Sequence, residues 1–171
     1  MCIVQTHRHE SAVIKSKPVG KHGLVQVDYF GMFTDAAAAT LVKRAREECE
    51  RAPVHIARFD RAVITCNVKA VASKGFKGSL APGAMVCRPD QYEGIAAMCS
   101  ALSAAGALRL VFLDYSEALD WAEHLAAGLM RHGLRQMPGR KHPIEEQDRL
   151  LVVCQKDKPA NQQMANRLAG R

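Results

Sequence analysis

The chain has 171 residues, enough for one domain with an appended segment, and its 48% hydrophobic residues can fill a core. The sequence contains no run of about 20 apolar residues and no basic start followed by an apolar stretch, so we expect a cytoplasmic protein without a membrane span. Six cysteines without a CxxC pair predict small buried side chains in a reducing compartment, rather than disulfides or a zinc site.

The net charge of +7 is concentrated towards the C-terminus. Residues 1–130 contain 15 Lys/Arg and 13 Asp/Glu, a difference of +2, whereas residues 131–171 contain 9 and 4, a difference of +5. We therefore expect a nearly neutral domain over residues 1–133, followed by a basic linker and C-terminal extension over residues 134–171. Such an extension either aids solubility or meets nucleic acid, acidic proteins or anionic membrane surfaces. The candidate contacts to nucleic acid are Arg135, Arg140 and Lys141.

Strands are predicted in the first 33 residues. Short apolar pieces at residues 2–6 and 12–14 precede the strongest strand, residues 24–33, in which apolar and polar side chains alternate. Gly31 inside this strand indicates a bulge or a close approach of another backbone segment. Thr34 then caps a helix with one apolar stripe, which Pro53 terminates.

The middle of the chain alternates between apolar and charged pieces. Residues 54–59 predict a strand, followed by a turn or a short second strand up to Cys66. Residues 67–83 fit either a short helix or a loop. Residues 84–87 predict another short strand, and Asp90 and Glu93 have the spacing of a capping box at the start of the next helix.

The apolar run at residues 108–113 is interrupted only by Arg109 and leads directly into an amphipathic helix that closes at Gly133. We interpret this run as the central strand of the sheet. Residues 134–148 are typical of a linker, and residues 149–155 would suit an edge strand. Alternating strands and helices after an all-strand start predict an α/β fold, with a mixed, mainly parallel sheet of four to six strands and helices packed on it.

A family resemblance appears in residues 82–126, PGAMVCRPDQYEGIAAMCSALSAAGALRLVFLDYSEALDWAEHLA. This stretch resembles the C-terminal half of small bacterial STAS-like proteins, relatives of the anti-sigma-factor antagonists. Residues 27–42, VDYFGMFTDAAAATLV, resemble the strand–glycine–helix start of the same family. The positions that match the later motif are Pro82, Gly83, Ala84, Arg88, Pro89, Asp90, Gln91, Gly106, Arg109, Val111, Phe112, Glu117, Ala118, Leu119 and Trp121.

The resemblance implies a regulatory or ligand-binding module without catalytic activity. In the antagonists of this family, a partner kinase phosphorylates a serine at a helix start. The corresponding residues 59–67 here, FDRAVITCN, lack the Asp-Ser-x-Gly sequence, and the nearest hydroxyl groups belong to Thr65 and Ser73. This departure argues against a phosphorylation switch. The candidate partner-binding residues are Thr65, Asn67 and Ser73.

The best candidate for anion binding is the segment KGFKGS at residues 74–79. Its two glycines free backbone amides and its lysines bring positive charge, although the spacing of a P-loop is absent. The candidate ligand-binding residues are Lys69, Lys74, Lys77 and Ser79; a solvated turn is the simpler interpretation.

Catalytic and metal sites are weakly indicated. Cys66, His55 and Asp60 could form a nucleophilic triad, but their spacing does not require one, and His7 and His9 share a strand face without a third ligand. We therefore predict no catalytic residues, metal or cofactor. The main hypothesis is a STAS-like module that binds a partner protein or a small ligand, and the alternative is a nucleic-acid or anionic-surface binder that uses the basic extension. A homodimer is compatible with either.

Overall fold

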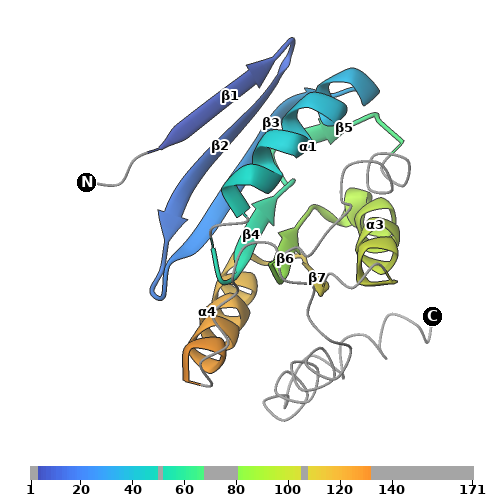
Figure 1. The fold of residues 1–171 in the computed structure, drawn as a ribbon. Coiled ribbons are helices and arrows are strands. Elements are labelled where there is room, and N and C mark those ends of the chain that lie inside the picture. The colour runs from blue at the N-terminus through green and yellow to red at the C-terminus, as the bar shows by residue number, and fades with distance from the viewer. Residues whose placement is uncertain (1–3, 50–51, 68–80, 105–107, 132–171) are drawn as a thin grey trace, which may run out of the picture. The chain divides into compact units, whose positions relative to one another are not determined.

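The computed structural model describes residues 4–49, 52–67, 81–104 and 108–131, which form an α/β fold with one mixed sheet (Figure 1). Its strands follow the order β1-β2-β3-β4-β6-β7, and β5 also pairs with β3. The strands are β1 (Gln5–His9), β2 (Ala12–Val19), β3 (Leu24–Phe33), β4 (His55–Arg58), β5 (Ala62–Ile64), β6 (Gly83–Val86) and β7 (Arg109–Phe112). The helices are α1 (Asp35–Cys49), the 3-10 turn η1 (Pro89–Gln91), α3 (Tyr92–Ala104) and α4 (Tyr115–Arg131).

The predicted fold class is confirmed. β1, β2 and β3 pair antiparallel, whereas β4 and β5 both run parallel to β3, and β6 and β7 continue the parallel part. The short second strand expected before Cys66 is β5. Gly31 has φ +79°, and a side chain there would overlap the carbonyl oxygen of Ser11, so the predicted close backbone approach is confirmed.

The helices cover the sheet on both faces. α1 and α3 share one buried cluster with Val27 and Tyr29 of β3, Ala57 of β4 and Met85 of β6. α4 packs on the opposite face, where its contacts run to β6, β4, β7 and β3. Val111 of β7 packs against the α1–α3 cluster. Because side chains alternate along a strand, the next residue, Phe112, points to the other face. Its ring lies 5.8 Å from that of Trp121 on α4.

Side-chain caps set the starts of two helices. The Thr34 hydroxyl accepts a hydrogen bond from the Ala37 amide at 3.3 Å, which confirms the predicted cap of α1. Asp114 caps α4, because its carboxylate accepts bonds from the amides of Ser116 and Glu117 at 2.7 and 3.1 Å. Within the described residues, no helix combines the length and apolar character needed to cross a membrane.

The prediction that residues 108–113 form the central strand is wrong. Among the described strands, β7 pairs only with β6 and stands last in the strand order. Its apolar composition arises because α3 contacts it and α4 covers its other face. A parallel strand covered on both faces is apolar wherever it stands in the sheet.

The predicted capping pair Asp90 and Glu93 is replaced by a different arrangement. The Gln91 side chain accepts a hydrogen bond from the Arg88 amide at 3.0 Å, and the guanidinium of Arg88 pairs with Asp90. The helix itself begins at Tyr92. The expected domain boundary at 133/134, the linker and the strand at 149–155 lie outside the described residues.

Candidate functional site

The predicted partner-binding residues Thr65 and Asn67 lie after β5, beside the start of α1. The Thr65 hydroxyl and the Thr65 amide both donate to the Phe33 carbonyl at 3.1 Å, and the Asn67 amide donates to Asp35 at 2.9 Å. Both side chains are exposed, but these bonds fasten the segment after β5 to the helix start. Eight other candidates lie outside the described residues and stay predictions: Lys69, Ser73, Lys74, Lys77, Ser79, Arg135, Arg140 and Lys141.

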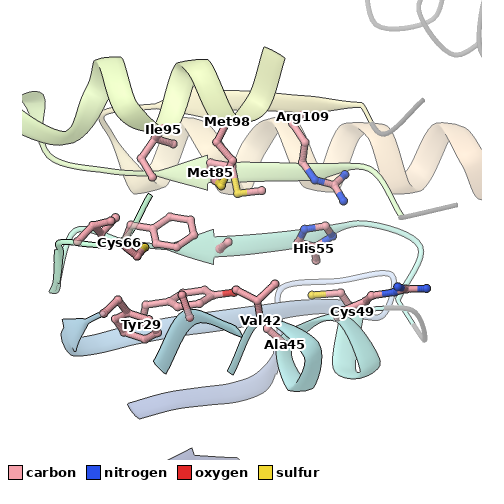
Figure 2. A pocket seen from close by; sticks show the side chains of 16 residues that line it. Tyr29, Val42, Ala45, Cys49, His55, Cys66, Met85, Ile95, Met98 and Arg109 are labelled. Carbon is pink, nitrogen blue, oxygen red and sulfur yellow. The ribbon is translucent and has the colours of Figure 1, made fainter. Parts of the chain in front are cut away.

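A cavity of about 60 Å³ lies between the sheet and helices α1 and α3. Aromatic and aliphatic side chains line most of it, including Tyr29, Met85, Ile95 and Met98. Figure 2 shows that polar groups gather at one end, where Arg109 approaches His55 from the side of β7. The cavity is thus apolar along most of its length and carries a basic group at that end.

The polar end arises from one row of residues across the parallel strands. The register pairs Val25 of β3 with His55 of β4, His55 with Gly83 of β6, and Gly83 with Arg109 of β7. A methyl group on Gly83 would overlap the imidazole ring of His55. Glycine at this position therefore lets the His55 ring lie over β6, towards Arg109.

Arg109 is a buried cation without a carboxylate partner among the described residues. Its side chain is 4% exposed, and its Nη1 donates to the carbonyl oxygens of Ala81 and Leu108 at 2.5 and 2.7 Å. The Nε atom is buried and has no hydrogen-bond partner. Burial lowers the pKa of Arg109 to about 10, so the guanidinium remains charged at neutral pH. A buried charge that lacks an opposite charge is costly to keep.

His55 is neutral beside this charge. Burial and then the charge on Arg109 lower the pKa of His55 well below its ordinary value, and its Nδ1 has no partner among the described residues. Burial raises the pKa of the neighbouring Tyr29 hydroxyl, which stays protonated. The cavity lining therefore combines the buried charge of Arg109 and the half-buried Arg46 with neutral groups that can donate or accept hydrogen bonds.

Sequence reasoning missed this site, although the signal was visible. In the sequence, Arg109 is an interruption of an apolar strand and a position of the family motif, and Gly83 is a position of the same motif. An arginine inside a strand that is otherwise apolar is either paired or functional, because burying an isolated charge is unfavourable. Neither role could be assigned without knowing that His55 and Gly83 stand in the same row.

The hypothetical triad is not assembled. His55 points into the cavity, whereas the Asp60 carboxylate binds the guanidinium of Arg58 through two contacts of 3.2 and 2.7 Å. Cys66 also lines the cavity, at a distance from His55 in Figure 2, and burial raises its thiol pKa. A protonated thiol far from a base is a poor nucleophile.

A polar network lies on the α4 face of the sheet. The Tyr115 hydroxyl donates to Gln26 at 2.6 Å, and Gln26 donates to Asp28 at 2.7 Å. The guanidinium of Arg58 lies 3.8 Å from Asp28 and 4.6 Å from the centre of the Tyr115 ring. These bonds satisfy the buried polar side chains and tie the start of α4 to β3 and β4.

Beyond α4, the same face carries exposed and half-buried apolar and basic side chains on β1, β2, β3 and β5 and in the turn before β5. We call this surface the open sheet face. Strand alternation and register place seven of its members on one side of the sheet: Arg8, Val13, Lys15, Lys17, Phe30, Met32 and Val63. The eighth member, Arg61, lies in the turn before β5 and approaches the Phe30 ring. Met32 and Val63 pair across β3 and β5 and are 47% and 52% exposed. Lys15 and Arg61 lie 5.5 and 5.7 Å from the centre of the Phe30 ring.

Comparison with known proteins gives one similarity in structure. No protein-family model matches the sequence, and no curated protein is significantly similar to it. Among solved structures, the crystal structure of an anti-sigma factor antagonist from Mycobacterium paratuberculosis is 13% identical, covers 72% of this chain and 95% of its own, and has a TM-score of 0.42.

Proposed function

We propose that the protein is a non-catalytic regulatory module of the STAS-like kind that binds an acidic partner protein on its open sheet face. The observation that carries the proposal is the combination of Met32 and Val63, both about half exposed, with basic side chains around them. Exposed apolar groups rimmed by charges of one sign are typical of interaction surfaces. A partner with acidic and apolar side chains would complement both features.

The charge of this face supports an acidic partner. Arg8, Lys15, Lys17 and Arg61 all belong to it, and no member of it is acidic. Two carboxylates beside this face, Asp28 and Asp60, are already paired with Arg58. The positive charge of the open sheet face is therefore not neutralised by its own sheet, and it would steer an acidic surface towards it.

The geometry favours a protein over a single-stranded nucleic acid. Nucleic acid needs free aromatic faces on which bases can stack. Phe30 is the aromatic residue of this face, and its ring is approached by Lys15 and Arg61. The most exposed apolar groups are aliphatic, which suits contact with apolar protein side chains.

The absence of catalysis is supported by the states of the thiols. Burial raises the pKa of Cys87 to about 11 and that of Cys99 to about 12, so both stay protonated. Burial also raises the pKa of Cys66. With the neutral imidazole of His55 directed into a largely apolar cavity beside a cation, these groups lack the activation that a nucleophile needs.

Binding of nucleic acid through the basic extension is the second candidate. The excess of 9 Lys/Arg over 4 Asp/Glu in residues 131–171 supports it. This mode predicts salt-dependent binding of DNA or RNA that is lost when the chain is cut after Gly133. Binding to the open sheet face would survive the same cut.

The proposal is tested with a synthetic peptide in which Glu alternates with Leu and Phe. We expect the double variant Lys15→Glu, Arg61→Glu to bind this peptide at least about tenfold more weakly, because it places like charges opposite each other. The control is Lys43→Glu with Arg44→Glu, which reverses two exposed charges on α1. Isothermal titration at low ionic strength measures the affinity. Equal loss in both variants, or no binding by the wild-type protein, would refute the proposal.

A further inference from the structure

We propose that the cavity beneath α1 and α3 is a binding site for a small monocarboxylate with a short apolar body. Arg109 would hold the carboxylate, and the aliphatic and aromatic walls would enclose the rest. This site is separate from the open sheet face, which lies on the other side of the sheet. Its test is therefore independent of the proposed partner binding.

The first argument is the unfilled bonding capacity of Arg109. Its Nη1 already donates to two carbonyl oxygens, whereas the buried Nε has no partner among the described residues. The remaining edge of the guanidinium, formed by Nε and Nη2, has the geometry that accepts both oxygens of a carboxylate. A ligand carboxylate would supply the missing bond and the missing negative charge together.

The second argument is that the groups acting on Arg109 include no carboxylate that could pair with it in place of a ligand. The groups whose charges act on Arg109 are Cys49, Cys99 and Tyr29, and none is a carboxylic acid. No Asp or Glu occurs between residues 61 and 89, a stretch that includes β5, β6 and the connection between them. The positive charge is therefore available to an anion that enters from solution.

The third argument is the shape of the polar end. Because residue 83 is glycine, the imidazole of His55 can lie across β6, and its Nδ1 also lacks a partner among the described residues. A neutral imidazole does not repel a neighbouring cation, and one of its ring nitrogens can donate a hydrogen bond to an anion. Arg109 and His55 thus present two buried polar groups at the same end of the cavity (Figure 2).

The size and walls of the cavity define the ligand. A water molecule occupies roughly 10–15 Å³ on this measure, so a cavity of about 60 Å³ admits roughly four to six non-hydrogen atoms. Tyr29, Met85, Ile95 and Met98 make the remainder apolar. A fully hydrated inorganic anion would leave these walls poorly matched, whereas propionate has a suitable charge, size and alkyl group.

The test uses the full chain carrying 13C-methyl methionine and titrates it with sodium propionate. We expect saturable NMR shifts of the Met85 and Met98 methyl groups, because both line the cavity. Two ligands probe the chemistry: propionamide keeps the shape without the charge, and nitrate keeps the charge without the alkyl group. Each should bind at least tenfold more weakly than propionate.

Three variants locate the site. Arg109→Met should lower propionate affinity at least tenfold, whereas Arg44→Met, which removes an exposed arginine from α1, should leave it unchanged. Ala57→Leu keeps Arg109 but fills the cavity from β4, and should also abolish the shifts. The proposal is overturned if propionamide or nitrate binds as well as propionate, if Ala57→Leu binds normally, or if wild-type protein shows no saturable shift. These comparisons decide the question even if Arg109→Met does not fold.

Discussion

Gly83 shows how a single missing side chain makes room for a functional group. Its backbone needs no unusual conformation that requires glycine; the requirement comes from the imidazole of His55, which occupies the space of a Cβ. The neighbouring residue in the row, Arg109, is buried at a cost that favourable packing elsewhere must offset. The row therefore gives an otherwise apolar cavity a polar end and lowers the free energy of unfolding.

A pair of glycine substitutions tests this interpretation. Gly83→Ala should destabilise the protein by about 1–3 kcal/mol, because the added methyl group must displace the His55 ring from a packed site. Gly94→Ala is the matched control: it lies on α3, with nothing within 4 Å of the added carbon. It should raise stability by about 0.5–1 kcal/mol, since alanine is the better helix former. Urea unfolding measures both, and equal effects would contradict the role of Gly83.

Among the elements, the segment between β6 and α3 joins parts of the chain that are distant in sequence. Arg88 donates from its guanidinium to the carbonyl oxygens of Asp60 and Ala62 at 2.9 and 3.1 Å. Gln91 donates to the same Ala62 oxygen at 2.8 Å and accepts from the Arg88 amide at 3.0 Å. The segment thus holds β5 against the start of α3.

Gln91→Ala should destabilise the protein by about 1–3 kcal/mol, because it leaves the partly buried Ala62 carbonyl and Arg88 amide with fewer partners. Glu93→Ala, two positions along on an exposed site, should change stability by less than about 0.5 kcal/mol. Thermal and denaturant unfolding of the two variants provide the comparison. A Glu93 effect as large as that of Gln91 would show that these bonds do not anchor the segment.

Local sequence patterns predicted which helices and strands form better than they predicted where those elements lie in the fold. The Thr34 cap, the strand at 24–33 and the short β5 follow from residue type and spacing, because each depends on neighbouring residues. The position of β7 could not be predicted, since burial by α3 and α4 gives the last of the described strands the composition of a central one. The hydrogen bond from Gln91 to the Ala62 carbonyl reaches 29 residues back along the chain, beyond any local pattern.

The candidate site was predicted less well than the fold. The anion-binding and partner-binding loops were chosen from glycine, lysine and hydroxyl content, and most of their residues lie outside the described part of the chain. The cavity depends on His55, Gly83 and Arg109, which the parallel register brings into one row from three strands. Such a row becomes visible only when the strand order and register are known.

At the scale of the whole molecule, the sheet is covered unequally on its two faces. α1 and α3 pack on one face, whereas on the other the contacts of α4 run from β3 to β7. The exposed side chains of β1, β2 and β5 continue that second face beyond the helix. The proposed partner surface, which is the open sheet face, and the proposed small-molecule cavity thus lie on opposite faces of the sheet.

The most direct measurement of this central claim is a 1H–15N NMR titration of the full chain with the acidic, apolar peptide. The account predicts that the perturbed backbone amides cluster on β2, β3 and β5, around Lys15, Phe30, Met32 and Val63, and that the shifts weaken with added salt. Perturbations confined to the α1–α3 face, or to residues beyond 133, would contradict it.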